Sequence, residues 1–202
     1  MRLILASTSP RRREIMALLG APFEVIAPQF DERVSAQASI EEEVLRFALG
    51  KAQSVANMNP DSIVIGSDTM IQLDGEKIGK PLDVDDARRI LRLLSGKTHK
   101  IYTSVAIIDG VGGAGLRTIE TVVITMRELS PDEIERYVAA GESLDKAGAY
   151  SIQGQGRNLI AAMEGDYLAA VGMPLKPIAG YLTERGVECA RDIAMFYTKK
   201  TS

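Results

Sequence analysis

The chain has 202 residues, of which 46% are hydrophobic and 25% charged, an ordinary globular composition that argues against disorder and predicts one domain over residues 1–202. Its net charge of −3 provides no general attraction to nucleic acid or anionic lipid, so any polyanion site must be local and no nucleic acid polymer is expected as a partner. The single cysteine, Cys189, excludes an intrachain disulfide and a multi-cysteine zinc site.

The first residues, MRLILASTS, predict a buried strand over residues 2–7. Their apolar run is too short for a signal peptide, and no apolar run approaches the roughly 20 residues that a membrane-spanning helix needs. We therefore expect a cytoplasmic protein with no membrane partner. Ser9 then suits the N-cap of a helix, Pro10 its first position and Gly20 its end.

The next part of the chain predicts a strand, a long helix and a hairpin. The helix start is marked by a capping box of Ser39 and Glu42, and the Asp-Gly pair at residues 74–75 is typical of a tight hairpin turn. In chain order we expect a strand at 22–27, a helix from 40 to about 57, a buried strand from 61, a break at 66–69 and the hairpin turn at 74–75.

The second half predicts further helices and several adjacent strands. We expect helices at 83–94, 131–141, 174–185 and 187–197, long strands at 98–109 and 116–127, and short strands at 149–152, 159–163 and 167–170. A glycine-rich loop, GVGGAG, joins the long strands. So many adjacent strands argue against a purely parallel sheet, and we expect a mixed α/β domain.

Three arginines, Arg11, Arg12 and Arg13, fall in the first turn of the first helix, where the helix dipole disfavours cations. A strand that runs into a hydroxyl-rich turn and a capped helix is a natural cradle for an anion. A phosphate between the arginines and the helix end would explain the cluster. The alternative is a solvated first turn whose arginines pair with carboxylates elsewhere, and this stretch alone favours neither.

Lys51 lies in the middle of an apolar helical stripe, at helical spacing from Val44, Ala48 and Val55. Such a lysine must extend to solvent, find a buried anion or line a pocket. Extension to solvent is the commonest of these outcomes and is the one that we expect from the pattern alone.

Asp68 and Lys80 flank the hairpin region. Asp68 directly follows an apolar run, where a buried charge needs a partner or a metal. Lys80 lies between Gly79 and Pro81, which restrict the backbone around it as though its direction mattered. The alternatives are a turn aspartate and a surface lysine.

A loop at residues 141–156, GESLDKAGAYSIQGQG, contains Gln153 and several glycines. Such a loop either approaches a ligand closely or is a long surface connection. His99 is interpreted as a strand-edge residue rather than a base. Cys189, on the last expected helix, is interpreted as structural.

Six stretches follow one another in the order of the Maf family, from Leu3 to about Leu175: LILASTSPRRREIMALLG, DERV, LGKAQSVA, VIGSDTMIQLDGEKIGKPLD, ILRLLSGKTHKIYTSVAI and GESLDKAGAYSIQGQG. The chain therefore resembles a family of nucleoside triphosphate pyrophosphatases that was first named for inhibition of septum formation. The resemblance implies a fold similar to that of the inosine triphosphate pyrophosphatases, with a long mixed sheet flanked by helices and two lobes around a cleft. It also implies a homodimer.

The resemblance assigns roles at matching positions. It makes Asp68 the catalytic carboxylate that activates the attacking water, and it places Glu32 and Asp68 at the metal. The implied substrate-binding residues are Ser7, Arg11, Arg12, Lys51, Thr69, Lys80 and Gln153. Of these, Arg11, Thr69 and Gln153 mark the branch that acts on dTTP and UTP rather than on 7-methyl-GTP.

Charge and metal chemistry agree with this assignment. A triphosphate carries about four negative charges near neutral pH, which cationic side chains and a divalent metal offset. Carboxylate ligands such as Glu32 and Asp68 suit Mg²⁺ or Mn²⁺. Arg13 lies outside the family motif and is expected to be solvated.

The leading hypothesis is a pyrophosphatase that hydrolyses dTTP and UTP, with modified pyrimidine nucleotides as further candidate substrates, to cleanse the nucleotide pool or restrain cell division. The alternative is a nucleotide-binding regulator of septum formation that acts through a protein partner. A nucleotidyltransferase is a weaker third hypothesis, because nothing in the sequence suggests a second substrate site.

Overall fold

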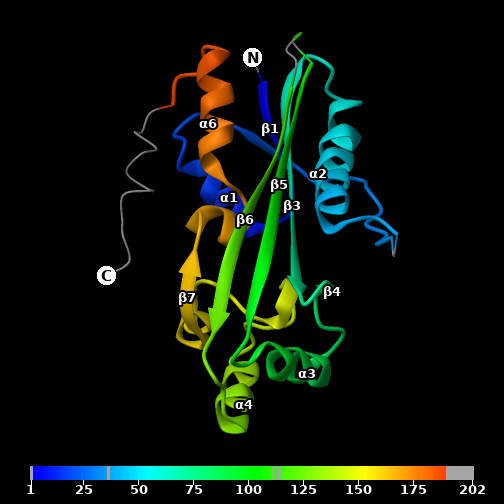
Figure 1. The fold of residues 1–202 in the computed structure, drawn as a ribbon. Helices are drawn as coiled ribbons and strands as arrows, with labels where there is room; N and C mark the ends of the chain where they lie inside the picture. The colour runs from blue at the N-terminus through cyan, green and yellow to red at the C-terminus, as the bar shows by residue number, and fades with distance from the viewer. Residues whose placement is uncertain (1, 36, 111, 113–114, 190–202) are drawn as a thin grey trace. The chain divides into compact units, whose positions relative to one another are not determined.

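The computed structural model describes residues 2–35, 37–110, 112 and 115–189. The chain divides into two compact units. The first comprises Met1–Asp68, Thr103–Glu120 and Asp166–Ser202, and the second comprises Thr69–Tyr102 and Thr121–Gly165. Figure 1 shows the long strands, which contribute residues to both units.

The strands form one mixed sheet of seven strands in the order β2-β1-β3-β5-β6-β7, with β4 paired to β3. Strand β1 is parallel to β2 and β3, whereas β4 is antiparallel to β3 and β7 to β6. The predicted mixed α/β architecture is thereby confirmed. The strands are β1 (Arg2–Ala6), β2 (Glu24–Ile26), β3 (Ser62–Leu73), β4 (Glu76–Ile78), β5 (Thr98–Asp109), β6 (Leu116–Met126) and β7 (Ile160–Glu164).

The helices begin where the sequence places their caps. Ser9, Ser39 and Ser130 each accept a hydrogen bond from the backbone of the helix that they precede, and the last two form full capping boxes. The helices are α1 (Pro10–Ala17), α2 (Ile40–Ala56), α3 (Val84–Leu94), α4 (Pro131–Ala139), α5 (Tyr167–Val171) and α6 (Leu175–Glu184), with 3₁₀ turns η1 (Ala147–Ala149) and η2 (Gly154–Leu159). No helix in the described part of the chain is long and apolar enough to cross a membrane.

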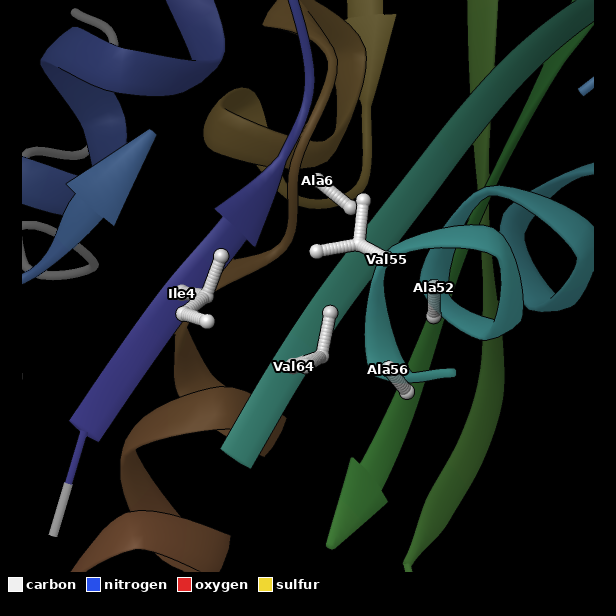
Figure 2. Packing of buried hydrophobic residues seen from close by; sticks show 6 residues of the cluster. All are labelled: Ile4, Ala6, Ala52, Val55, Ala56 and Val64. Carbon is white, nitrogen blue, oxygen red and sulfur yellow. The ribbon is translucent and has the colours of Figure 1, made fainter. Parts of the chain in front are cut away.

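Small side chains let α2 pack closely on the strands of the first unit. Figure 2 shows side chains of α2 against those of β1 and β3. Each isoleucine or valine in this cluster contributes about 1.5–3 kcal/mol through burial. The six residues are Ile4, Ala6, Ala52, Val55, Ala56 and Val64. Figure 1 shows α6 on the other side of these strands.

Gly66 lies where α2 and β3 approach each other closely. A Cβ atom at this position would lie 2.2 Å from the carbonyl oxygen of Ala48 and 2.9 Å from the backbone nitrogen of Ala52. Only glycine lets the helix backbone come this near. The same contact brings the middle of α2 over the strand and so positions the side chain at residue 51.

The hairpin between β3 and β4 turns where the sequence predicts it. Asp74 and Gly75 have φ values of 50° and 88°, the left-handed backbone that a two-residue hairpin turn of this type needs. The turn pairs Leu73 with Glu76 and Ile71 with Ile78.

Several expected elements are wrong. The break at 66–69 does not exist, because β3 continues to Leu73. Residues 149–152 form no strand, and residues 167–170 lie in a helix, α5. Residues 187–189 are irregular, and the remainder of the helix expected at 187–197 lies outside the described residues, as do residues 111 and 113–114 of the glycine-rich loop. The cleft between two lobes and the single domain over 1–202 stay predictions.

Candidate active site

Lys51 and Asp68 form a buried ion pair in the first unit. The Nζ atom of Lys51 lies 2.6 Å from Oδ1 of Asp68, and their side chains are 8% and 7% exposed. The expected extension of Lys51 to solvent is therefore wrong. The lysine instead takes the second of the three outcomes, a buried anion, because a carboxylate of β3 lies within its reach.

Glu32 completes a cluster around the same ammonium group. Its Oε1 lies 2.7 Å from Nζ of Lys51, and its side chain is 47% exposed. Two carboxylates, Glu32 and Asp68, thus converge on one nitrogen, one of them buried and the other open to solvent. We call these three residues the Lys51 cluster.

A buried acid holds the segment that carries Glu32. Glu43 is fully buried on α2, and its Oε1 accepts hydrogen bonds from the backbone nitrogen of Ser35 (2.7 Å) and from Arg46 (2.9 Å). Arg46 also donates to the carbonyl oxygen of Arg33 at 2.6 Å. The two backbone groups that are held in this way, at Arg33 and Ser35, lie one and three residues after Glu32. Glu43 therefore restricts where the Glu32 carboxylate can lie.

Glu43 was not among the predicted site residues, although a signal for it was present. It lies eight residues before Lys51 and four before the buried Phe47, on the same apolar face of α2. Phe30, from the segment before Glu32, packs edge-on against Phe47 with ring centroids 5.8 Å apart. A charged residue in an apolar stripe indicates a partner elsewhere in the chain.

Arg12 faces the carboxylates of the cluster from α1. Its Nε donates to the carbonyl oxygen of Gly172 at 2.9 Å, and the buried hydroxyl of Ser67 donates to the same oxygen at 3.1 Å. Burial lowers the pKa of the Arg12 guanidinium, whereas the nearby Asp68 and Glu32 raise it. An arginine stays protonated at neutral pH, so Arg12 is a second cation beside the cluster.

Burial raises the pKa of the Asp68 carboxyl, and the neighbouring Lys51 and Arg12 oppose the increase. A carboxylate whose pKa is raised above its usual value is a stronger proton acceptor. The cluster therefore combines a candidate base with two cations.

The start of α1 is built as the sequence predicts. The Oγ atom of the buried Ser7 accepts from the backbone nitrogen of Ser9 at 3.1 Å, and Oγ of Ser9 accepts from that of Arg12 at 3.5 Å. Arg11 is half-buried and Arg13 is exposed. Arg13 is thus solvated, as expected.

The other predicted site residues, Thr69, Lys80 and Gln153, belong to the second unit. Lys80 and Gln153 are exposed and Thr69 is half-buried. The backbone nitrogen of Gly148 donates to the carbonyl oxygen of Gly79 at 3.0 Å, which joins the loops of Lys80 and Gln153. That all three residues share one site with the Lys51 cluster stays a prediction.

His99 and Cys189 differ from their interpretations in part. His99 is 2% exposed on β5, a strand with neighbours on both sides, rather than at a strand edge. Its Nε2 lies 2.6 Å from the hydroxyl oxygen of Tyr150. Cys189 is half-buried in an irregular segment and not on a helix.

The donor set fits a hard divalent cation that is bound together with phosphate. Among the residues that the structure describes, no group of three or more His, Cys, Asp or Glu side chains could hold a metal alone. Mg²⁺ is usually held by one or two carboxylates plus substrate phosphate oxygens, however, and Glu32 and Asp68 are two converging carboxylates.

Residues 2–185 match the family described as "Maf-like protein". A "dTTP/UTP pyrophosphatase" of Moorella thermoacetica is 45% identical over 187 residues, which cover 93% of this chain and 96% of that protein. Another, from Bacillus cereus strain B4264, is 41% identical over 190 residues, with 93% and 97% covered. The solved structure of the Staphylococcus aureus Ham1 protein matches with a TM-score of 0.53 and 14% identity over 92% of this chain and 100% of that one, a likeness of fold alone.

Proposed function

The chain belongs to the Maf family, and from this premise we propose that it is a dTTP/UTP pyrophosphatase, a hydrolase that converts each triphosphate to its monophosphate and pyrophosphate. One observation carries the proposal. A buried lysine lies between two carboxylates, with an arginine beside them. Burying charges of both signs costs free energy. The hydrolysis of a polyanionic substrate needs both, because cations bind the phosphates and a carboxylate activates the water.

In the proposed reaction the cations bind the triphosphate and Asp68 accepts a proton from water. Lys51 and Arg12 offset the negative charge that repels the attacking oxygen and that grows on the leaving group. The hydroxide formed at Asp68 attacks phosphorus, and the bond between the α- and β-phosphates breaks. The electron pair of that bond leaves with the departing phosphate oxygen.

The divalent cation, Mg²⁺ or Mn²⁺, is part of the proposal. Glu32 and Asp68 would hold it, and when bound it would neutralise phosphate charge and lower the pKa of bound water. The exposed half of the Glu32 side chain leaves that carboxylate accessible to an ion that arrives with the nucleotide.

The proposal assigns substrate selection to residues at the positions that mark the dTTP and UTP branch of the family. Arg11, Thr69 and Gln153 would distinguish thymine and uracil nucleotides from others. Ser7 and Lys80 would contact the phosphates. A homodimer, a cytoplasmic location and a role in cleansing the nucleotide pool complete the proposal.

The test is a nucleotide panel with the full chain. The protein is incubated with dTTP, UTP, dCTP, CTP, dGTP and ATP in the presence of Mg²⁺ or Mn²⁺, and the products are separated. We expect the monophosphates of thymidine and uridine together with pyrophosphate. Release of orthophosphate, or hydrolysis of the purine nucleotides only, would defeat the proposal.

A further inference from the structure

The residues around Gln153 divide sharply between buried and exposed. Tyr150, Ser151 and Ile152 are buried, with 4%, 6% and 8% exposure, whereas Gln153 and the two residues after it are exposed. We call residues 150–156 the Gln153 segment. An exposed side chain on this segment is presented from a backbone that is held inside the second unit.

Two buried hydrogen bonds hold the segment at its start. Nε2 of His99 lies 2.6 Å from the hydroxyl oxygen of Tyr150, and the two rings meet edge-on with centroids 5.5 Å apart. The backbone nitrogen of Ser151 donates to the hydroxyl oxygen of Tyr137, on α4, at 2.9 Å. Oγ of Ser151 in turn accepts from the backbone nitrogen of Gln153 at 3.1 Å. A continuous series of contacts thus runs from β5 to Gln153.

Glycines tighten the rest of the segment. Gly154 has a φ of 62°, and a Cβ atom there would lie 2.8 Å from Oε1 of Glu142. A Cβ atom on Gly156 would lie 2.2 Å from the carbonyl oxygen of Ser151 and 2.9 Å from the hydroxyl oxygen of Tyr137. At Gly154 the positive φ disfavours a larger residue, and at Gly156 the backbone of Ser151 leaves no room for a side chain, so both glycines restrict the path of the segment.

Within the part of the chain that the structure describes, the buried ring of His99 is hydrogen-bonded on one side only. Its Nδ1 is buried and has no hydrogen-bond partner among the described residues. An unsatisfied buried nitrogen is destabilising, and a leucine would remove that penalty only by leaving the buried hydroxyl of Tyr150 without its histidine partner. Burial lowers the pKa of His99 to about 4, so the ring is neutral near pH 7. What remains for His99 to provide is its hydrogen bond to Tyr150.

We propose that His99 and Tyr150 are positioning residues for base selection: their hydrogen bond fixes the backbone that presents Gln153. The inference rests on the proposed function and on the role that it gives Gln153. A glutamine amide can present an N–H donor and its carbonyl acceptor side by side, which complement the carbonyl and N3–H of thymine or uracil. Cytosine has an unprotonated N3 and an amino group at these positions, so an amide held for thymine or uracil does not complement it. If the amide is displaced, we expect this preference for dTTP over dCTP to decrease.

The experiment compares four variants with dTTP and dCTP. His99→Leu and Tyr150→Phe remove the bond, His99→Gln keeps an amide near the position of Nε2, and Tyr102→Phe is the control. The hydroxyl of Tyr102, also on β5, donates to Gln72 on β3 at 3.2 Å, a bond to a strand and not to the Gln153 segment. For the first two we expect KM for dTTP to rise about tenfold at nearly unchanged kcat, and the preference for dTTP over dCTP to fall about tenfold. His99→Gln should restore most of both, and Tyr102→Phe should change neither.

A second readout follows the segment itself. Amide hydrogen exchange in residues 150–156 should become faster in His99→Leu and Tyr150→Phe and should stay slow in Tyr102→Phe, while thermal unfolding confirms that each variant folds. Unchanged exchange, or an unchanged base preference despite faster exchange, overturns the inference. If the wild type prefers other nucleotides, the proposed function fails. The inference is then tested by measuring whether the same variants lose the preference for whichever base the wild type selects.

Discussion

The Lys51 cluster of the first unit and the His99–Tyr150 pair of the second bury polar groups in opposite ways. The cluster joins an ammonium to two carboxylates, and one of those, Glu32, is 47% exposed. The pair is neutral and closed to solvent. Both arrangements cost free energy relative to apolar packing. The difference indicates two uses of buried polarity: charges that act on a ligand, and neutral hydrogen bonds that act on the backbone.

The comparison makes contrasting predictions for variants. Changes in the charged cluster should reduce turnover much more than they reduce stability. Changes in the neutral pair should alter the pH dependence of the free energy of unfolding and the preference between bases, while kcat stays nearly unchanged. The predictions below run from the largest expected effect to the smallest.

Asp68→Asn should reduce turnover at least about a thousandfold, because the amide keeps the size of the carboxylate but accepts no proton from water. The variant should still fold and bind nucleotide. Turnover is measured as pyrophosphate release, and folding by thermal unfolding. Asp61→Asn, at an exposed aspartate just before β3, is the matched control and should be fully active. Retained turnover in Asp68→Asn would remove Asp68 from the mechanism.

His99 should make the free energy of unfolding depend on pH. Its pKa is about 4 in the folded chain and about 6.5 in the unfolded one, so between these values the unfolded chain binds the additional proton. Stability should therefore be fully present above pH 6.5 and fall by about 3 kcal/mol as the pH decreases to 4. Urea unfolding at a series of pH values measures the decrease. The same series in His99→Gln should lack this contribution, and an identical slope in both proteins would contradict the assignment.

Arg12→Ala should lower kcat/KM about a hundredfold, since it removes a partly buried cation that would face the substrate phosphates. Arg13→Ala is the matched control in the same helical turn, and its exposed side chain predicts wild-type kinetics. Steady-state kinetics with dTTP measure both. Equal losses in the two variants would mean that only the net charge of this turn matters.

Glu43→Ala should lower kcat/KM about tenfold, because the segment that carries Glu32 loses its buried anchor on α2. Its melting temperature should also decrease, since Arg46 loses a partner. Glu41→Ala changes an exposed acid in the same turn of α2 and should have neither effect. Normal activity in Glu43→Ala would show that Glu32 needs no support from this side.

Local signals predicted the helix starts and the hairpin well. The caps at Ser9, Ser39 and Ser130 and the turn at Asp74 and Gly75 depend on contacts within four residues along the chain. Such contacts form whatever the rest of the fold does, so the sequence pattern alone is enough.

Short apolar runs were the main source of error. Residues 167–170 are too few to distinguish a strand from a helix by periodicity. The missed signal was Asp166, whose carboxylate accepts from the backbone nitrogens of Leu168 and Ala169 and so starts α5. Gly66 was interpreted as a strand break, although it is a position of close helix packing.

The charged residues of the candidate site were identified from the sequence, but their supports were not. Glu32, Lys51 and Asp68 were all named, and the structure brings them together. The carbonyl of Gly172 that orients Arg12 is 160 residues away in the chain, and a backbone oxygen has no signature in a sequence. Contacts of this kind depend on the complete topology.

Gly66 has a consequence for how the enzyme tolerates genetic change. A single added methyl group, as in Gly66→Ala, would meet the backbone of α2 and push the helix away from β3. The ammonium of Lys51 would then separate from Asp68 although no ionisable atom had been altered. A residue that has no side chain is therefore necessary for the chemistry, and selection for activity should act on Gly66 as strictly as on Lys51 and Asp68.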